Sequence, residues 1–255
     1  MRYTEYKDLY YKLNSPEDLE RLVKKGYDRE MLMVLYTQRV TRDVKKSFYK
    51  VKNNTGRMLK DWRQGHSLME ISKRYRFPPI LTAMFVLQEM GMNKKKFWSY
   101  VRGEEKVKDC RLEKEIQEIN ENDYVYSTWA NDQQRQRGEW GEALLEEWLD
   151  SQGIDYRTEE DLRGVYAKTP DCLFEEPVVV DGKEVMWIES KATFGDVPEF
   201  RFNARKQLVP YTELFGPGLV VYWFGHLDDL ELPDDVYIID KSLTDIDVER
   251  GDDSR

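Results

Sequence analysis

Apolar residues recur at helical spacing through the first half of the chain and gather in short strand-like runs through the second half. The first helical signal lies at residues 15–23, where a serine cap, a proline and two acids precede a Leu-x-x-Leu-Val pattern. Another helix is indicated between Leu32 and Val44. These signals predict a helical, nucleic-acid-binding region over residues 1–124.

A helix-turn-helix pattern occupies residues 67–91 of that region. Ser67 and Glu70 form a capping box, and a turn at residues 75–79 separates the first helix from a second amphipathic helix that ends at Gly91. In a DNA-binding helix-turn-helix the second helix lies in the major groove, although a plain scaffold hairpin has the same outline. The basic residues expected to contact nucleic acid are Lys73, Arg74 and Arg76.

The pattern changes near Arg135, and residues 125–255 are predicted to form an α/β domain. A helix at residues 139–149 precedes the strand-like runs DYRT, TPDCLF, EPVVV and EVMWIESKA. A helix near residues 203–214 and the runs GLVVYWFG and DVYIID follow. Hairpins and one helical crossover in this order predict a central mixed β-sheet flanked by helices.

Two charged residues stand within the apolar strand WIESKA. Because alternate side chains of a strand share a face, Trp187, Glu189 and Lys191 should lie on one face, with Ile188 and Ser190 on the other. Burying an acid and an amine inside a sheet costs several kcal/mol unless each is paired or binds a metal. The plain alternative is a structural Glu189–Lys191 ion pair on an exposed edge strand.

A second acid, Asp171, is expected beside Glu189. Asp181-Gly182 predicts a two-residue hairpin between the strands that carry the two acids. A strict hairpin register would set Asp171 opposite residue 192, close to Glu189 but not facing it. A β-bulge near Pro177, which cannot donate a ladder hydrogen bond, would supply the missing shift.

Two neighbouring carboxylates suggest a metal site. Asp171 and Glu189 offer the hard oxygen ligands that Mg²⁺ or Mn²⁺ prefers, and the ion would activate a water for attack on a phosphodiester. Lys191 would orient or deprotonate that water and stabilise the transition state.

Two further segments flank the predicted site. On the helix RGEWGEALLEEWL the expected buried stripe consists of Trp140, Ala143, Leu144 and Trp148. At the flank of this stripe Glu142 is the third candidate metal ligand and catalytic residue, with Glu139 and Glu146 as rivals. The residues at the start of the crossover helix that would reach a substrate phosphate or position a water are Arg205, Lys206 and Gln207.

Composition narrows the chemistry. Two cysteines and two histidines leave catalysis mainly to carboxylates and lysines. The chain has no long apolar run and its N-terminal residues are too polar for a signal peptide, which predicts a cytoplasmic protein, nucleoid-associated in a prokaryote. The net charge of −9 divides into +11 over residues 1–110 and −20 over the remainder. A basic first half favours nucleic acid, although two mutually attracting domains would show the same asymmetry.

The same residues carry a resemblance to known families. A glycine-glutamate pair at 141–142, Pro-Asp at 170–171 and Glu-Ser-Lys at 189–191 resemble the PD-(D/E)XK nuclease superfamily over residues 135–240. Thr169-Pro170-Asp171, together with FGPGLVVYWFG, is more closely similar to the TPD-motif family, and the short acidic chain resembles its archaeal members.

The resemblance implies helix-turn-helix segments ahead of a restriction-endonuclease-like PD-(D/E)XK domain. It also implies a metal-dependent nuclease with Asp171 and Glu189 as metal ligands and Lys191 as the catalytic lysine. Glu142 corresponds by position to the helix glutamate of the superfamily. A protein partner is a further implication of the family.

The leading prediction is a Mg²⁺-dependent or Mn²⁺-dependent endonuclease that acts on DNA, including structured or branched DNA. No sequence feature distinguishes DNA from RNA, so a ribonuclease stays open. The alternative from another class is a non-catalytic nucleic-acid-binding or adaptor protein that retains the nuclease fold. Homodimers are common among relatives that cut both strands, because one active site cuts one strand, but no sequence feature demonstrates a dimer.

Overall fold

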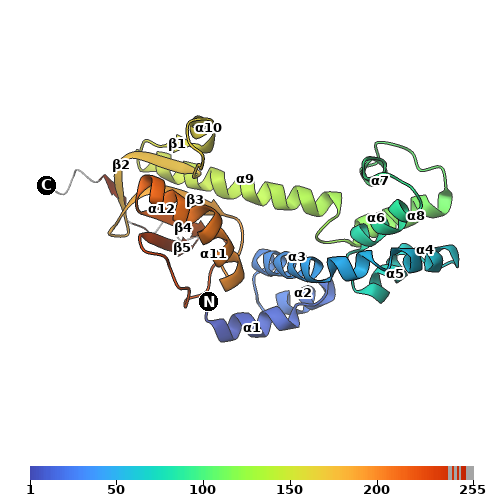
Figure 1. The fold of residues 1–255 in the computed structure, drawn as a ribbon. Coiled ribbons are helices and arrows are strands. Elements are labelled where there is room, and N and C mark those ends of the chain that lie inside the picture. The colour runs from blue at the N-terminus through green and yellow to red at the C-terminus, as the bar shows by residue number, and fades with distance from the viewer. Residues whose placement is uncertain (241–242, 244–245, 247, 251–255) are drawn as a thin grey trace. The chain divides into compact units, whose positions relative to one another are not determined.

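The computed structural model describes residues 1–240, 243, 246 and 248–250 (Figure 1). The chain forms two compact units, which we call the sheet unit, Met1–Leu35 with Gln136–Arg255, and the helical unit, Tyr36–Arg135. Among the described residues, no helix combines the length and the apolar character needed to cross a membrane.

The division into units differs from the expected boundary at residue 124, because residues 1–35 belong with the C-terminal part of the chain. Tyr6 of α1 (Tyr3–Lys12) stacks on Phe194 with ring centroids 5.6 Å apart. Its hydroxyl donates a buried hydrogen bond of 2.5 Å to Asp196 Oδ2. These long-range contacts follow no local periodicity, so a sequence pattern does not reveal them.

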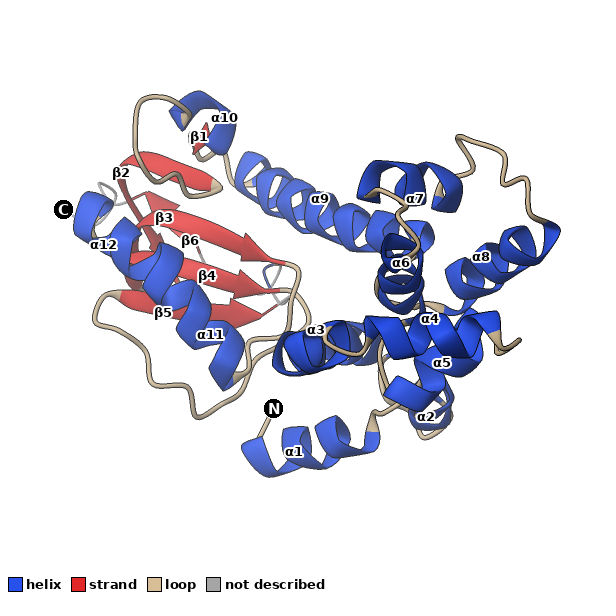
Figure 2. Cartoon of the chain, turned by 45° about the vertical axis from the view of Figure 1, so that its right-hand side comes forward, coloured by secondary structure: helices blue, strands red, loops and turns tan. Residues whose placement is uncertain are grey.

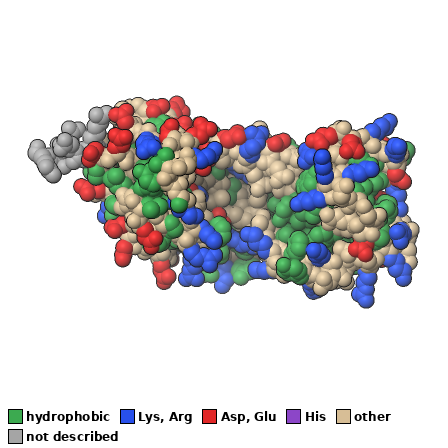
Figure 3. All heavy atoms as spheres, turned by 45° about the horizontal axis from the view of Figure 1, so that its top comes forward, with side chains coloured by type: hydrophobic (Ala, Val, Ile, Leu, Met, Phe, Trp, Pro, Cys, Tyr) green, Lys and Arg blue, Asp and Glu red, His purple; other side chains and the backbone are tan. Residues whose placement is uncertain are grey.

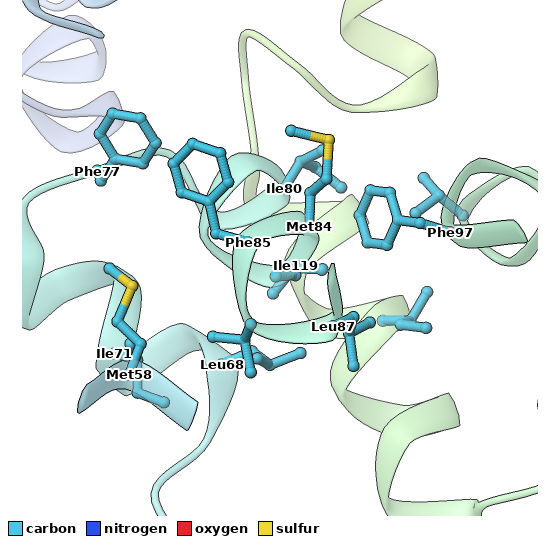
Figure 4. Packing of buried hydrophobic residues seen from close by; sticks show 14 of the residues in the cluster. Met58, Leu68, Ile71, Phe77, Ile80, Met84, Phe85, Leu87, Phe97 and Ile119 are labelled. Carbon is cyan, nitrogen blue, oxygen red and sulfur yellow. The ribbon is translucent and has the colours of Figure 1, made fainter. Parts of the chain in front are cut away.

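The helical unit is built around a single buried helix, α6. Its helices are the second part of α3 (Arg29–Lys52), α4 (Thr55–Arg63), α5 (Leu68–Tyr75), α6 (Pro79–Glu89), α7 (Lys94–Val101), α8 (Cys110–Asn122) and the first turns of α9 (Thr128–Ser151). Figure 4 shows Ile80, Met84 and Phe85 of α6 packed among side chains from the surrounding elements. The capping box of Ser67 and Glu70 begins α5 as predicted.

The structure does not support α6 as a DNA-recognition helix. Residues 82–87 of α6 are all buried, so the helix has no free side to place in a major groove. The hairpin of α5 and α6 serves as the core of the unit, which is the scaffold alternative. The segment 110–122 is likewise part of this core, because Leu112, Ile116 and Ile119 of α8 are buried in it.

The sheet unit contains a mixed six-stranded sheet (Figure 2). Its strands are β1 (Arg157–Thr158), β2 (Cys172–Val180), β3 (Lys183–Lys191), β4 (Gly218–Tyr222), β5 (Val236–Asp240) and β6 (Val248–Arg250). The order is β1-β2-β3-β4-β5, with β6 paired to β2. Strands β1, β2 and β3 are antiparallel neighbours, whereas β3, β4 and β5 run parallel. This agrees with the predicted mixed sheet.

Helices cover both faces of this sheet and fix the direction of each strand side chain. Besides α1, the first turns of α3 and the later turns of α9, the helices of the sheet unit are α2 (Pro16–Val23), α10 (Glu159–Leu162), α11 (Val197–Asn203), a π-helical turn η1 (Ala204–Leu208) and α12 (Val209–Phe215). Leu145 and Leu149 of α9 pack against the face that contains Ile188. Phe200, Leu208 and Tyr211 of the α11–η1–α12 crossover pack against the face that contains Trp187. The alternation predicted for WIESKA is thereby confirmed.

Candidate active site

A register shift in the β2–β3 hairpin brings the two predicted acids together. Near the Asp181-Gly182 turn Val178 faces Val185, whereas farther along Cys172 faces Ile188. The shift lies between residues 173 and 178, the interval that contains Pro177, as predicted. Continuing the outer register by one residue sets Asp171, immediately before β2, opposite Glu189 of β3.

Glu189 lies in the interior of the sheet. Its strand runs between β2 and β4, and only 2% of the residue is exposed. The Glu189–Lys191 ion pair of the plain alternative is present, but it lies inside the sheet and not on an exposed edge strand. Glu189 Oε1 accepts hydrogen bonds from Lys191 Nζ and from Gln207 Nε2, the latter at 2.9 Å. Lys191 and Gln207 therefore hold one of the two carboxylate oxygens in place.

The second oxygen of Glu189 is left without such partners. Glu189 Oε2 is buried and accepts no hydrogen bond from any residue that the structure describes. Burial, together with the nearby charge of Asp171, raises the pKa of Glu189 to about 7, although Lys191 opposes the shift. Burial also raises the pKa of Asp171, against the opposing effects of the Lys191 charge and the Ser190 N–H group.

The π-helical turn η1 supplies the amide that holds Glu189. In η1 the Val209 N–H group bonds to Ala204 O, five residues back, and the wider turn presents Gln207 to the sheet. Pro210 has no N–H group to bond to Lys206 O. That carbonyl instead accepts a hydrogen bond of 3.1 Å from Lys168 Nζ.

A second contact network anchors the segment before Asp171. Tyr211, one turn after Gln207, donates its hydroxyl proton to Thr169 O at 2.8 Å. Gln207 Nε2 also lies 3.3 Å from the Tyr211 hydroxyl. The crossover helix thus contacts Glu189 of β3 and the segment that leads into Asp171 and β2.

On the other face of β3, the one that packs against α9, Ser190 forms two hydrogen bonds that hold the strand in place. Its backbone N–H group donates to Asp171 Oδ2 at 2.7 Å, and its hydroxyl accepts a hydrogen bond of 2.7 Å from Trp223 Nε1. Gly141 of α9 lies against the same pair, because a Cβ atom there would be 2.6 Å from Trp223 Nε1 and 3.1 Å from Ser190 Oγ. Glycine is therefore required for α9 to approach the strand this closely.

The close approach of α9 places Glu142 near the acids while leaving it exposed. Burial and the negative charge of Asp171 raise the pKa of Glu142, and Lys191 opposes them. The predicted stripe of α9 is partly wrong, since Trp140 and Ala143 are exposed. The residues of this segment that are buried are Gly141, Leu145, Trp148 and Leu149. The rotation of α9 about its own axis, which decides the residues that are buried, follows from the contact between Gly141 and Ser190.

The predicted substrate-binding residues lie at three places. Arg205 and Lys206 are exposed on η1, in the middle of the crossover helix and not at its start as expected, and Gln207 faces Glu189. Lys73, Arg74 and Arg76 are exposed in the helical unit. Arg74 pairs with Asp61 at 2.6 Å.

Asp171 and Glu189 have the oxygen ligands that a divalent cation requires. Two facing carboxylates and a buried carboxylate oxygen without a donor form an oxygen-rich, electron-donating surface of the kind that Mg²⁺ or Mn²⁺ prefers. Throughout the described part of the chain, no three His, Cys, Asp or Glu side chains are gathered closely enough to form a complete ligand cluster. Glu142 is therefore not drawn into contact with the two strand acids.

Four residues contribute to the site without a role assigned from sequence: Thr169, Ser190, Tyr211 and Trp223. Thr169 and Ser190 belong to the motifs that carry the family resemblance. The four-residue spacing of Gln207 and Tyr211 is a usable signal, because it places both on one face of a helix. The partnership of Ser190 and Trp223 joins residues 33 positions apart, and no local signal indicates it.

Comparison with known proteins relates the sequence of this chain to a family. Residues 108–242 match the family described as "Protein of unknown function TPD sequence-motif". The chain is 31% identical over 172 residues to CDAN1-interacting nuclease 1 of Bos taurus, covering 64% of this chain and 61% of that protein. The human protein of that name is 30% identical over the same length with the same coverage.

The relative from Gallus gallus, also named CDAN1-interacting nuclease 1, is 27% identical over 237 residues, or 84% of this chain and 82% of that protein. The matched region thus spans about 61% of the length of the cattle and human relatives. No solved structure gives a significant match.

Proposed function

We propose a nuclease function for this chain, which belongs to the TPD sequence-motif family. The activity proposed is the metal-dependent hydrolysis of phosphodiester bonds by a PD-(D/E)XK-type site, with DNA as the substrate. Nuclease is part of the printed name of the relatives. An archaeal-type origin within the family belongs to the same proposal.

One observation carries the proposal: the buried Glu189 oxygen without a hydrogen-bond donor, located where Asp171 faces the same strand. An unsatisfied buried carboxylate oxygen costs about 1–3 kcal/mol, so a stable protein retains one where it serves a ligand. Asp171 and Glu189 would hold Mg²⁺ or Mn²⁺, with Glu142 of α9 as the third candidate ligand. When bound, such an ion neutralises charge on the phosphate and supplies a nucleophilic water.

The remaining chemistry belongs to side chains of this chain. Gln207 holds Glu189 Oε1, and the Ser190 N–H group holds Asp171 Oδ2, so both acids are oriented before a substrate arrives. Lys191 carries its ammonium group beside Glu189, where it can orient the attacking water and offset the charge that develops on the phosphate. Arg205 and Lys206 are exposed and can bind flanking phosphates.

The test compares the wild-type protein with Asp171→Asn and Lys191→Ala. Glu176→Gln is the matched control, because it removes an exposed acid from β2, the strand that follows Asp171. Each protein is incubated with single-stranded, duplex, flap and four-way-junction DNA and with RNA, in Mg²⁺, Mn²⁺ or EDTA. We expect metal-dependent cleavage by the wild type and the control, and none by the other two variants.

Two outcomes would overturn the proposal. Cleavage by the Asp171→Asn and Lys191→Ala variants at the wild-type rate would remove the site from the reaction. Binding that persists in EDTA without cleavage of any substrate would favour the non-catalytic adaptor. The relatives are named for an interaction with CDAN1, and a protein partner for this chain, like a homodimer, is a separate proposal for pull-down and light-scattering experiments.

A further inference from the structure

The helical unit is basic, and its charge is concentrated in one stretch of chain. Tyr36–Arg135 contains 21 Lys and Arg residues against 13 Asp and Glu residues, whereas the rest of the chain contains 19 against 36. On the face drawn in Figure 3, acidic side chains are correspondingly frequent over the sheet unit and Lys and Arg over the helical unit. Residues 44–60 include six Lys or Arg residues and no acid.

All six basic residues of this stretch are exposed. They lie on the last turns of α3 and the first turns of α4, and they are Lys45, Lys46, Lys50, Lys52, Arg57 and Lys60. Two acids border this stretch in sequence: Asp43, which lies 3.9 Å from Lys46 Nζ, and Asp61, which pairs with Arg74. They therefore offset only part of its charge. We call this surface the α3–α4 basic face.

An exposed aromatic ring lies at the centre of the basic face. Tyr49 is 76% exposed, more than any other large apolar or aromatic residue among those that the structure describes. Val44 and Val51 turn toward the core, and the helical period of 100° per residue places Tyr49 on the opposite side of α3. On that side Lys45 and Lys52 lie to one flank of Tyr49, and Lys46 and Lys50 lie to the other.

Core packing does not account for this tyrosine. The Phe48 ring is partly buried against the core and meets the Tyr49 ring edge to face, with centroids 5.6 Å apart. Despite this contact, 76% of Tyr49 stays exposed. An aromatic ring flanked by lysines is the arrangement that binds nucleic acid through phosphate contacts and base stacking.

We propose that the α3–α4 basic face binds nucleic acid, with its lysines on consecutive phosphates and Tyr49 stacked on an unpaired base. The inference rests on the proposed function for the class of ligand alone, since binding requires neither the metal nor the active-site acids. It replaces the expected helix-turn-helix contact, because α6 is buried and Arg74 is engaged by Asp61. Single-stranded nucleic acid is the favoured form, because its bases are free to stack.

The test is fluorescence anisotropy in EDTA, with a labelled single-stranded DNA 20-mer and the duplex of the same sequence. One variant combines Lys45→Gln, Lys46→Gln and Lys52→Gln. The matched control combines Lys94→Gln, Lys95→Gln and Lys96→Gln, which removes the same charge from exposed positions at the start of α7 in the same unit. Tyr49→Ala and Tyr49→Phe separate stacking from charge.

We expect the variant of the basic face to weaken single-strand binding by about 10- to 100-fold at low salt. Its slope of log affinity against log salt should fall by about 2, since each phosphate contact contributes about 0.7 for single strands. Tyr49→Ala should weaken single-strand binding by about 5- to 100-fold and duplex binding less, whereas Tyr49→Phe should retain affinity. The α7 control should stay close to the wild type.

Equal losses in the two triple variants would show that only net charge matters and would overturn the proposal. So would a Tyr49→Ala variant with unchanged affinity, or wild-type binding to polyglutamate as strong as to DNA, which would indicate an acidic protein segment as the partner. Absence of cleavage in Mg²⁺ with specific binding intact would instead defeat the nuclease proposal and leave this inference standing.

Discussion

Buried carboxylates occur in both units of the protein, and their oxygens are satisfied to different degrees. In the helical unit Glu115 accepts hydrogen bonds from Trp62 Nε1, the Leu68 N–H group and Arg111 Nε, at 2.8, 3.0 and 2.7 Å. These donors engage both of its oxygens. In the sheet unit only Oε1 of Glu189 is engaged by donors from the described residues.

Asp123, the other buried acid of the helical unit, follows the same rule as Glu115. Its Oδ2 accepts from the Ile80 N–H group at the start of α6, and its Oδ1 accepts from the N–H groups of Val125 and Tyr126. A buried acid that serves the fold is thus fully hydrogen-bonded. The incomplete bonding of Glu189 supports the proposal that this acid serves a ligand.

The proposed difference between Glu189 and Glu115 is tested most directly by removing the charge of Glu189. Glu189→Gln should lower the cleavage rate by about 10²–10³-fold, because half of the paired negative charge that would hold a cation is lost. The measurement is single-turnover cleavage of the best substrate at saturating Mn²⁺. Glu115→Gln, compared only as folded protein, should leave that rate unchanged. Equal effects of the two substitutions would abolish the functional distinction between the two acids.

The second prediction concerns Glu115 in the helical unit, where the substitution should affect stability and not cleavage. Glu115→Ala should lower the free energy of unfolding of the helical unit by about 3 kcal/mol, because three donors lose their acceptor and one of them is charged. Hydrogen exchange across α5 and α8 measures this loss locally. Protection that stays at the wild-type level in these helices would mean that water replaces the carboxylate at little cost.

Local signals in the sequence predicted the parts of the fold that depend on neighbouring residues. The Ser67–Glu70 capping box and the Asp181-Gly182 hairpin are examples, and positive φ angles of 49° and 69° at the hairpin turn explain its residue choice. The β-bulge near Pro177 was predicted because two independent constraints, hairpin register and paired acids, disagreed without it.

The sequence-based predictions that were wrong concern features that depend on contacts between residues distant in sequence. Helix α6 has the period of an amphipathic recognition helix, yet helices from both sides of it in sequence cover its polar edge. The rotation of α9 follows from the contact of Gly141 with Ser190, about 50 residues later. The full hydrogen bonding of Glu115, which marks it as structural, likewise depends on partners in α4, α5 and the same helix. Acid residues in a sequence do not reveal whether their oxygens find donors.

A third prediction concerns the pH dependence of stability that the buried Glu189 produces. The pKa of Glu189 in the folded protein is about 7, above its ordinary value of 4.5. Between these values the folded state keeps a proton that the unfolded state has released, so stability falls as pH rises through this window. Glu189→Gln should remove that fall and stabilise the metal-free protein by about 1–2 kcal/mol at pH 8.

Thermal denaturation in EDTA between pH 4 and pH 8 measures the effect, with Glu176→Gln as the control that removes an exposed acid. A Glu189→Gln protein that is less stable than the wild type at pH 8 would show that Lys191 and Gln207 compensate the buried charge fully. In that case Glu189 would belong with Glu115 as a structural acid.

The smallest expected effect is the rise in the midpoint of thermal unfolding that binding of the metal produces. At a Mn²⁺ concentration of ten times the dissociation constant, binding to the folded state alone adds about 1.4 kcal/mol of stability. The midpoint of the transition should therefore rise by about 3–5 °C for a unit of this size. The Asp171→Asn variant should lose the shift, and hydrogen exchange should slow around β2 and β3 but not around α5 and α8. An equal midpoint shift in Asp171→Asn, or slower exchange in the helical unit alone, would show that the cation binds elsewhere. Another ligand would then be needed to explain why Glu189 Oε2 has no hydrogen-bond donor.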